Sequence, residues 1–206
     1  MNTIRILIAD DHLIVRTGLT ALLSTERGFL VVGQAKNGIE AVRGAIRLQP
    51  DIVIMDLMMP KKDGVAATAE IAEKAPNVRV LLLTTFGTSD RIAHALSSGA
   101  KGAILKNADN AELVKAIRRV AKGGEFISPE IQQQFAANPP IPEFTPRQKE
   151  ILHSMVRGLS DRDISRQLGI RLDGVNDHVR AILAKIGAAN RTEAVGIAMH
   201  KYLIRT

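Results

Sequence analysis

Five short apolar segments alternate with longer amphipathic segments over the first 122 residues, and this alternation constrains the fold more than any other feature. The apolar segments read IRILIA, FLVVGQA, DIVIMD, VRVLLLTT and GAILK. Short and almost continuous apolar runs are typical of strands that are buried on both faces, and the segments between them have helical spacing. The pattern therefore predicts five βα units, that is, an α/β fold with a doubly wound, five-stranded parallel sheet.

The alternation stops after that point. Residues 123–142 contain GG, SPE and QQQFAANPPIP, in which proline and small polar residues disfavour a continuous helix or strand. We therefore expect a linker at 123–142, between a first domain at 1–122 and a second domain at 143–206. Three residues with capping side chains mark helix starts in the second domain: Thr145, Ser160 and Thr192. That domain shows no strand signal and is expected to be small and all-α.

The composition narrows the compartment and the partners. The chain has no cysteine, which excludes disulfides and thiolate metal sites. The apolar run at 6–9 is too short for a signal peptide and no run is long enough to span a bilayer, so we expect a cytoplasmic protein without a membrane partner. The net charge of +7 suits a polyanion, and aromatic residues, at 3%, are too few to stack many unpaired bases. Duplex DNA is therefore favoured.

Charged and hydroxyl side chains close four of the predicted strands. Asp10 and Asp11 end the first strand, Asp56 the third and Thr84 the fourth, and Lys106 follows the fifth. Each alone could be an ordinary polar residue, but the carboxyl ends of parallel strands meet at one edge, where such sheets bind ligands. Converging carboxylates repel one another unless a cation such as Mg²⁺, which takes oxygen ligands, neutralises them. The set predicts a metal-assisted phosphoryl site.

Residues 3–122 resemble the receiver domains of two-component response regulators. The blocks IADDH, DLMMPKKDG, LLLTTF and GAKGAILKNA match that family in order and in spacing. The resemblance implies a flavodoxin-like fold and a sensor histidine kinase that phosphorylates Asp56. It also implies roles for the other residues: Mg²⁺ ligands Asp10, Asp11, Asp56 and the main-chain carbonyl of Met58, switch hydroxyl Thr84, and phosphoryl contact Lys106.

One position departs from the receiver family. Three residues before the lysine, where the family usually carries Tyr or Phe, this chain has Ala103. Phe86 is a weak candidate to fill part of that space, because Phe in such a loop more often packs the loop itself. The phosphoacceptor chemistry is expected to be intact, whereas coupling to the output surface is expected to be altered. An atypical regulator that binds DNA independently of phosphorylation is therefore the alternative.

Residues 144–204 resemble the LuxR-type helix-turn-helix output domain of the regulators related to nitrate and nitrogen-fixation regulators. FTPRQKEIL, GLSDRDISRQLGI and VNDHVRAILAKIGAANRTEAV match its blocks. Independently, 160–168 and 173–186 have the spacing of a scaffold helix and a recognition helix around a turn at Gly169. The resemblance implies binding to duplex DNA and a homodimer contact on the last helix, 193–204. Five residues form the apolar stripe of that helix: Ala194, Val195, Ala198, Met199 and Leu203.

The second of these helices has an apolar and a polar face. Four residues at helical spacing are expected to face the core: Val175, Val179, Ile182 and Ile186. On the other face, Asn176 can bond adenine and Arg180 can bond guanine, so these two are the base-reading candidates, with a plain solvated face as the alternative. Four further cations are expected to contact phosphates or to lie on the surface: Lys185, Arg171, Arg162 and Arg166.

The recognition helix also departs from its family. Arg171 and Asn176 stand where the family usually has a Ser or Thr cap and a Lys. Asp177 can accept a hydrogen bond from cytosine, but near phosphates its charge costs affinity. His178 is common in the family, and we expect it to have a structural or phosphate-bonding role. Weaker binding or an unusual DNA site is therefore expected.

Two other function classes fit the sequence less well. A Mg²⁺-dependent phosphatase would also cluster aspartates, but turnover needs a substrate pocket and a separate acid or base, and neither is found, so we expect no enzyme. A ligand-sensing regulator would need a pocket lined by aromatic residues, which are scarce here. The leading hypothesis is a transcription regulator controlled by phosphorylation.

Overall fold

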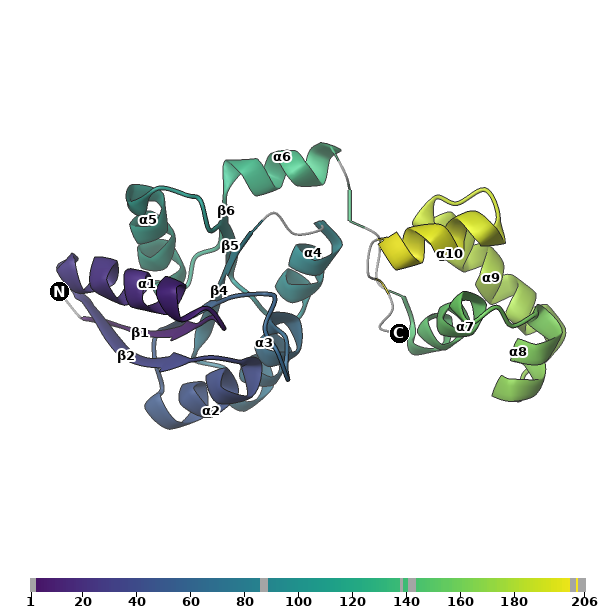
Figure 1. The fold of residues 1–206 in the computed structure, drawn as a ribbon, viewed down its shortest axis with the longest axis horizontal. Helices are drawn as coiled ribbons and strands as arrows, with labels where there is room; N and C mark the ends of the chain where they lie inside the picture. The colour runs from purple at the N-terminus through teal and green to yellow at the C-terminus, as the bar shows by residue number, and fades with distance from the viewer. Residues whose placement is uncertain (1–2, 86–88, 138, 141–143, 201–202, 204–206) are drawn as a thin grey trace. The chain divides into compact units, whose positions relative to one another are not determined.

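The computed structural model describes residues 3–85, 89–137, 139–140, 144–200 and 203, except for the side chain of His200. The chain forms two compact units, Met1–Pro140 and Ile141–Thr206 (Figure 1). Among the described residues, no helix is long and apolar enough to cross a membrane.

The first unit contains a six-stranded parallel sheet in the order β2-β1-β3-β4-β5-β6 (Figure 1). Its strands are β1 (Ile4–Ala9), β2 (Phe29–Ala35), β3 (Ile52–Met55), β4 (Arg79–Thr84), β5 (Gly102–Leu105) and β6 (Phe126–Ile127). The whole of β3 and β5 is buried, as strands between two helical layers must be. The predicted doubly wound α/β sheet is confirmed, with a sixth strand that was not predicted.

In the described part of this unit, six helices accompany the sheet: α1 (Leu13–Thr25), α2 (Gly38–Leu48), α3 (Gly64–Lys74), α4 (Ser89–Ser97), α5 (Asn110–Ala121) and α6 (Pro129–Ala137). Two separate core clusters show how they divide between the faces. Buried residues of α2, α3, α4 and α6 pack with one set of strand side chains, whereas those of α1 and α5 pack with the other set. Each face of the sheet is therefore covered by its own helical layer.

The predicted linker is wrong over most of its length. Within 123–142, β6 pairs with β5, and α6 buries Ile131 completely in the first core cluster. Ser128 lies directly before α6 and Pro129 is its first residue. A serine followed by proline is a common helix start. Glutamines are good helix formers, and the first proline of the NPPIP stretch comes only after α6 has ended.

The second unit contains helices α7 (Pro146–Val156), α8 (Asp161–Leu168), α9 (Leu172–Ile186) and α10 (Arg191–His200), and its described residues contain no strand. Thr145 and Ser160 cap α7 and α8, as predicted, and the structure shows a reciprocal capping box at each. The last helix begins earlier than predicted from Thr192. Asn190 caps it instead, because its Oδ1 accepts a hydrogen bond of 2.9 Å from the main-chain N–H of Glu193.

Candidate functional sites

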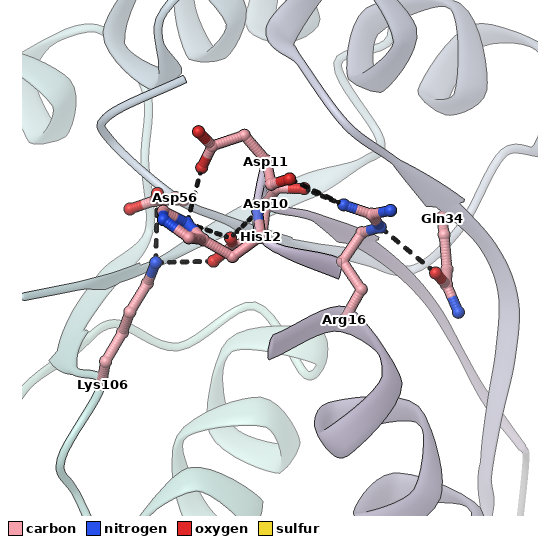
Figure 2. Close-up of polar contacts among 7 residues, drawn as sticks. All are labelled: Asp10, Asp11, His12, Arg16, Gln34, Asp56 and Lys106. Carbon is pink, nitrogen blue, oxygen red and sulfur yellow. Dashed lines mark hydrogen bonds and ion pairs between the residues drawn. The ribbon is translucent and has the colours of Figure 1, made fainter. Parts of the chain in front are cut away.

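The carboxylates at the ends of β1 and β3 lie together. Ligand atoms of Asp10, Asp11, His12 and Asp56 all lie within 4.8 Å of one another (Figure 2). The sheet aligns these residues, since the main-chain N–H of Asp56 bonds the carbonyl of Ala9 at 2.8 Å. Asp10 and Asp56 are buried, with side chains only 3% and 4% exposed. The structure therefore brings the three predicted carboxylates to one point at the edge of the sheet.

Lys106 and Thr84 complete the group. The Lys106 ammonium lies 2.6 Å from Oδ2 of Asp10 and 3.1 Å from Oδ2 of Asp56 (Figure 2). Thr84 is buried at the end of β4, and its carbonyl accepts a hydrogen bond of 2.7 Å from the main-chain N–H of Lys106. The parallel pairing of β4 with β5 thus holds Thr84 beside Lys106, whose ammonium contacts the carboxylates.

Burial and charge shift the ionisation of this group. Burial raises the pKa of Asp56, and the neighbouring charge of Asp10 raises it further, against the opposing effect of Lys106. Burial alone would lower the pKa of Lys106, but its contacts with Asp10 and Asp56 outweigh that effect and raise it. One partly buried cation therefore faces carboxylates that outnumber it, which is the situation that a divalent ion relieves.

The donor set fits Mg²⁺. Three carboxylates converge, and Oδ1 of Asp11 is a buried oxygen that accepts no hydrogen bond from the described residues. Met58 lies in the loop after β3, where its main-chain N–H donates to the Asp56 carboxylate and its side chain is exposed. An oxygen-rich site of this kind suits a hard cation that keeps some of its waters.

Two features of the backbone hold the site in shape. Arg16 of α1 donates to the carbonyl oxygens of Asp10 and Asp11 at 2.8 and 3.2 Å (Figure 2). Gly64, at the start of α3, packs against the main chain of Asp56, so closely that a Cβ there would overlap the carbonyl oxygen of Asp56. Arg16 was not predicted as a site residue, because an arginine six residues after an aspartate forms no recognisable sequence motif.

Ala103 is enclosed by β6 and α6, the strand and the helix that were not predicted. It is fully buried in β5 and pairs with Ile127 of β6. The same core cluster contains Ile131 of α6, with Phe135 packed against it. The position at which related domains carry an aromatic ring therefore faces a packed interior here. Phe86, the candidate to replace that ring, lies outside the described residues.

The turn between α8 and α9 has the predicted form. Gly169 ends α8 with a left-handed backbone, at φ 62°, and α9 begins after Arg171. The four predicted core residues of α9 are all buried: Val175, Val179, Ile182 and Ile186. Arg180 is 80% exposed, with one guanidinium nitrogen 3.6 Å from Oδ1 of Asp177. Asn176 and His178 are half-buried.

Lys185 has a different environment from the base-reading candidates. Its ammonium donates to Oε1 of Gln148 on α7 at 3.0 Å and lies 5.7 Å from the centre of the Phe144 ring. About 100° of rotation per residue puts Lys185 on the opposite side of α9 from Asn176. Arg171 makes no side-chain cap, and its side chain is 90% exposed.

Two family models match the chain. The response regulator receiver domain model matches residues 6–118, and the model described as bacterial regulatory proteins, luxR family, matches residues 142–198. These ranges correspond to the two units of the structure.

Several known proteins match nearly the whole chain. The chain is 35% identical to the oxygen regulatory protein NreC of Staphylococcus aureus over 214 residues, covering 97% of this chain and 99% of that protein. It is 32% identical to the crystal structure of ChrA, a response regulator of a heme-sensing two-component system, with a TM-score of 0.60 and coverage of 99% and 100%. RcsB of Salmonella enterica serovar Typhimurium, solved bound to a promoter, is similar in fold at 22% identity, with a TM-score of 0.69 over 95% of this chain and 98% of that chain.

Proposed function

The chain belongs to the two-component response regulators that carry a LuxR-type DNA-binding domain, and we propose that a sensor histidine kinase controls its DNA binding by phosphorylating Asp56. One observation carries the proposal. Lys106 lies within ion-pairing distance of both Asp10 and Asp56, at the edge of a parallel sheet where ligands bind. Such a group neutralises and positions charge, which is most of what phosphoryl transfer requires.

In this proposal Asp56 is the nucleophile. One of its carboxylate oxygens forms a bond to phosphorus, the bond from phosphorus to the kinase imidazole nitrogen breaks, and the electron pair returns to the imidazole. Lys106 then pairs with a phosphoryl oxygen. The Thr84 hydroxyl, as the switch, moves toward the phosphoryl group. Four groups would hold Mg²⁺, which neutralises the phosphoryl charge when bound: Asp10, Asp11, Asp56 and the main-chain carbonyl of Met58.

The raised pKa of Asp56 bears on this step. A protonated carboxyl group is a poor nucleophile, and burial favours that form. Lys106 and a bound divalent ion both favour the carboxylate. The cations of the site are therefore proposed to activate Asp56 as well as to stabilise its product.

In the DNA-binding domain, α9 is the proposed recognition helix. Arg180 projects into solvent, and Asn176 lies one turn before it, so the two can reach adjacent bases in the major groove. His178 and Lys185 are proposed to contact the backbone of the duplex. Asp177 lies beside Arg180 and is proposed to orient it or to accept from cytosine.

The proposed homodimer uses what remains exposed on α10. Ala194 and Ala198 are fully buried in the core of their own domain, whereas Met199 is 57% exposed. Only part of the apolar stripe predicted from the sequence is therefore available to a second copy. A two-fold dimer would match a two-fold DNA site. A kinase donor and a DNA target both imply a cytoplasmic location.

The alternative is a regulator that binds DNA independently of phosphorylation, and the buried Ala103, which stands in place of an aromatic residue, favours it. DNA binding of the full chain, measured with and without an acyl-phosphate donor and Mg²⁺, separates the two. The donor should add one phosphoryl group and tighten binding, and neither effect should occur in Asp56→Asn. Full phosphorylation of Asp56→Asn would contradict the assignment of the acceptor, and equal affinity with full phosphorylation would favour the alternative.

A further inference from the structure

An ion pair joins α4 to the loop between β3 and α3. One guanidinium nitrogen of Arg91, in the first turn of α4, lies 3.3 Å from Oδ2 of Asp63, the residue directly before α3. The two residues are 28 positions apart in the chain. Their side chains are only 24% and 13% exposed, so solvent and salt screen this pair less than an ordinary surface pair. The pair therefore restrains the loop relative to the helix.

The loop that Arg91 holds is the one that follows the proposed phosphoacceptor. Gly64, the first residue of α3, packs against the main-chain carbonyl of Asp56 and leaves no room for a Cβ. Asp63, directly before Gly64, caps α3, since its Oδ1 accepts a hydrogen bond of 2.9 Å from the main-chain N–H of Ala66. One carboxylate therefore bonds α3 with one oxygen and α4 with the other, next to the residue that contacts Asp56.

The same loop contains a residue in an unfavourable backbone conformation. Lys61 has a left-handed backbone, at φ 67°, and its two chain neighbours are joined by a main-chain hydrogen bond of 2.8 Å, which closes a three-residue turn. A residue other than glycine keeps such a conformation only where its surroundings hold it. Lys62 pairs with Glu70 of α3, and the Arg91 pair adds a restraint from α4. The loop is thus held from two helices.

The helix α4 is itself fixed in the core. Ile92, next to Arg91, and Ala95, one turn later, are both fully buried in the first core cluster. That cluster also contains Ile131 of α6, and α4 packs against both α3 and α6. The ion pair therefore connects the loop to the packed interior of the domain.

We infer that Arg91 is a positioning residue for the phosphoacceptor site: its pair with Asp63 holds the loop after β3 in the geometry in which Asp56 accepts a phosphoryl group. This inference rests on the proposed function. A reacting group has to be held within about 0.5 Å of its productive position, and contacts behind the site supply that restraint. By linkage, a bound phosphoryl group should strengthen the ion pair by the same factor by which the pair strengthens phosphoryl binding.

The test uses the full chain and beryllofluoride, an inert analogue of the phosphoryl group, at saturating Mg²⁺, with binding followed by the ¹⁹F signal of the bound ion. Arg91→Gln should raise the dissociation constant by about fivefold or more. Asp63→Asn should do the same and should keep the helix cap, because asparagine caps helices as well as aspartate does, and Asn37 caps α2 in this way. The double variant should lose no more than either single variant, because both substitutions remove one pair.

Arg118→Gln is the matched control. It removes a longer ion pair with Glu26, at 3.9 Å, from the helical layer on the other face of the sheet, and it should leave the dissociation constant unchanged. The unfolding midpoint of each variant is measured alongside. A lower midpoint of Arg91→Gln with a native dissociation constant would reduce the pair to a structural contact and overturn the inference, while the proposed phosphorylation site would still stand. Additive losses in the double variant would also overturn it. If beryllofluoride does not bind the native chain, the proposed function fails as well.

Discussion

The ammonium of Lys106 lies 2.6 Å from Oδ2 of Asp10, and both side chains are largely buried, at 16% and 3% exposure. The same ammonium lies 3.1 Å from Asp56. A buried cation that bridges two carboxylates stabilises a site whose charges would otherwise repel. Its loss should therefore affect the stability of the receiver domain as well as its phosphorylation.

We predict that Lys106→Met lowers the free energy of unfolding by about 3 kcal/mol without a divalent ion, because it leaves buried carboxylates unpaired. Mg²⁺ should reduce the deficit, since it neutralises the same oxygens. Urea unfolding with and without Mg²⁺ measures both effects. Lys101→Met is the control, because its contact with Glu125 is long, at 3.6 Å, and exposed. It should cost at most about 1 kcal/mol. Equal losses in the two variants would contradict a stabilising role for the buried pair.

The raised pKa of Asp56 gives a pH-dependent prediction. Between its unfolded and its raised folded pKa, the folded state binds more protons, so this group lowers the free energy of unfolding as the pH rises. Asp56→Asn removes that cost. The variant should therefore be more stable than the native chain at neutral pH without metal, and its advantage should shrink as the pH falls through the raised pKa. Thermal unfolding at several pH values tests this, and an advantage that grows on acidification would contradict it.

The sheet and the acidic site were predictable because their signals are local. Each strand is a short apolar run, and a parallel sheet puts the carboxyl ends of its strands at one edge, so Asp10, Asp56 and Lys106 had to be neighbours. The core face of α9 was predictable for a similar reason, since Val175 and Ile182 recur at helical spacing.

Other features depend on tertiary contacts that no local pattern carries. The strand β6 has two residues and becomes a strand only by pairing with the edge of β5. The helix α6 has one fully buried residue, Ile131, so its apolar stripe is too weak to recognise. The contact of Lys185 with Gln148 on α7 was not predicted, because it comes from packing within the domain. The capping of α10 by Asn190 was overlooked in favour of Thr192.

We predict that Ile131→Ala lowers the free energy of unfolding of the receiver domain by about 2–4 kcal/mol, because it leaves a cavity in the core cluster that contains Ala103. Gln133→Ala, at an exposed position of the same helix, should change it by no more than about 0.5 kcal/mol. Urea unfolding of the full chain measures both. A change of less than about 0.5 kcal/mol in Ile131→Ala would contradict a contribution of α6 to the core of the receiver domain.

The proposed recognition helix gives a prediction about DNA. Asn176→Ala and Arg180→Ala should each cost about 1–3 kcal/mol of affinity for the specific site, and much less on random duplexes, if the two residues contact bases. Lys185→Ala should weaken binding to all sequences alike. Titrations of both kinds of duplex at fixed salt measure the difference. Equal losses on specific and random DNA for all three variants would exclude base reading by α9.

The last prediction concerns coupling between the two domains. A phosphoryl group shifts an equilibrium only by its differential free energy for the two states, and Ala103 contributes no ring that could move between a buried and an exposed position. The Thr84 hydroxyl and Lys106 remain to respond to the phosphoryl group. Charge-assisted hydrogen bonds of that kind contribute about 1.5–3 kcal/mol each before offsetting costs.

We therefore predict that phosphorylation raises DNA affinity by less than about a hundredfold, which corresponds to about 2.7 kcal/mol of coupling. Titrating one duplex with phosphorylated and unphosphorylated protein at fixed salt measures this gain. Because α6 packs against the cluster that contains Ala103, Ile131→Val should alter the gain more than Gln133→Ala does. A gain of several thousandfold would show that another element carries the switch, and Phe86→Ala would then be the next substitution to measure.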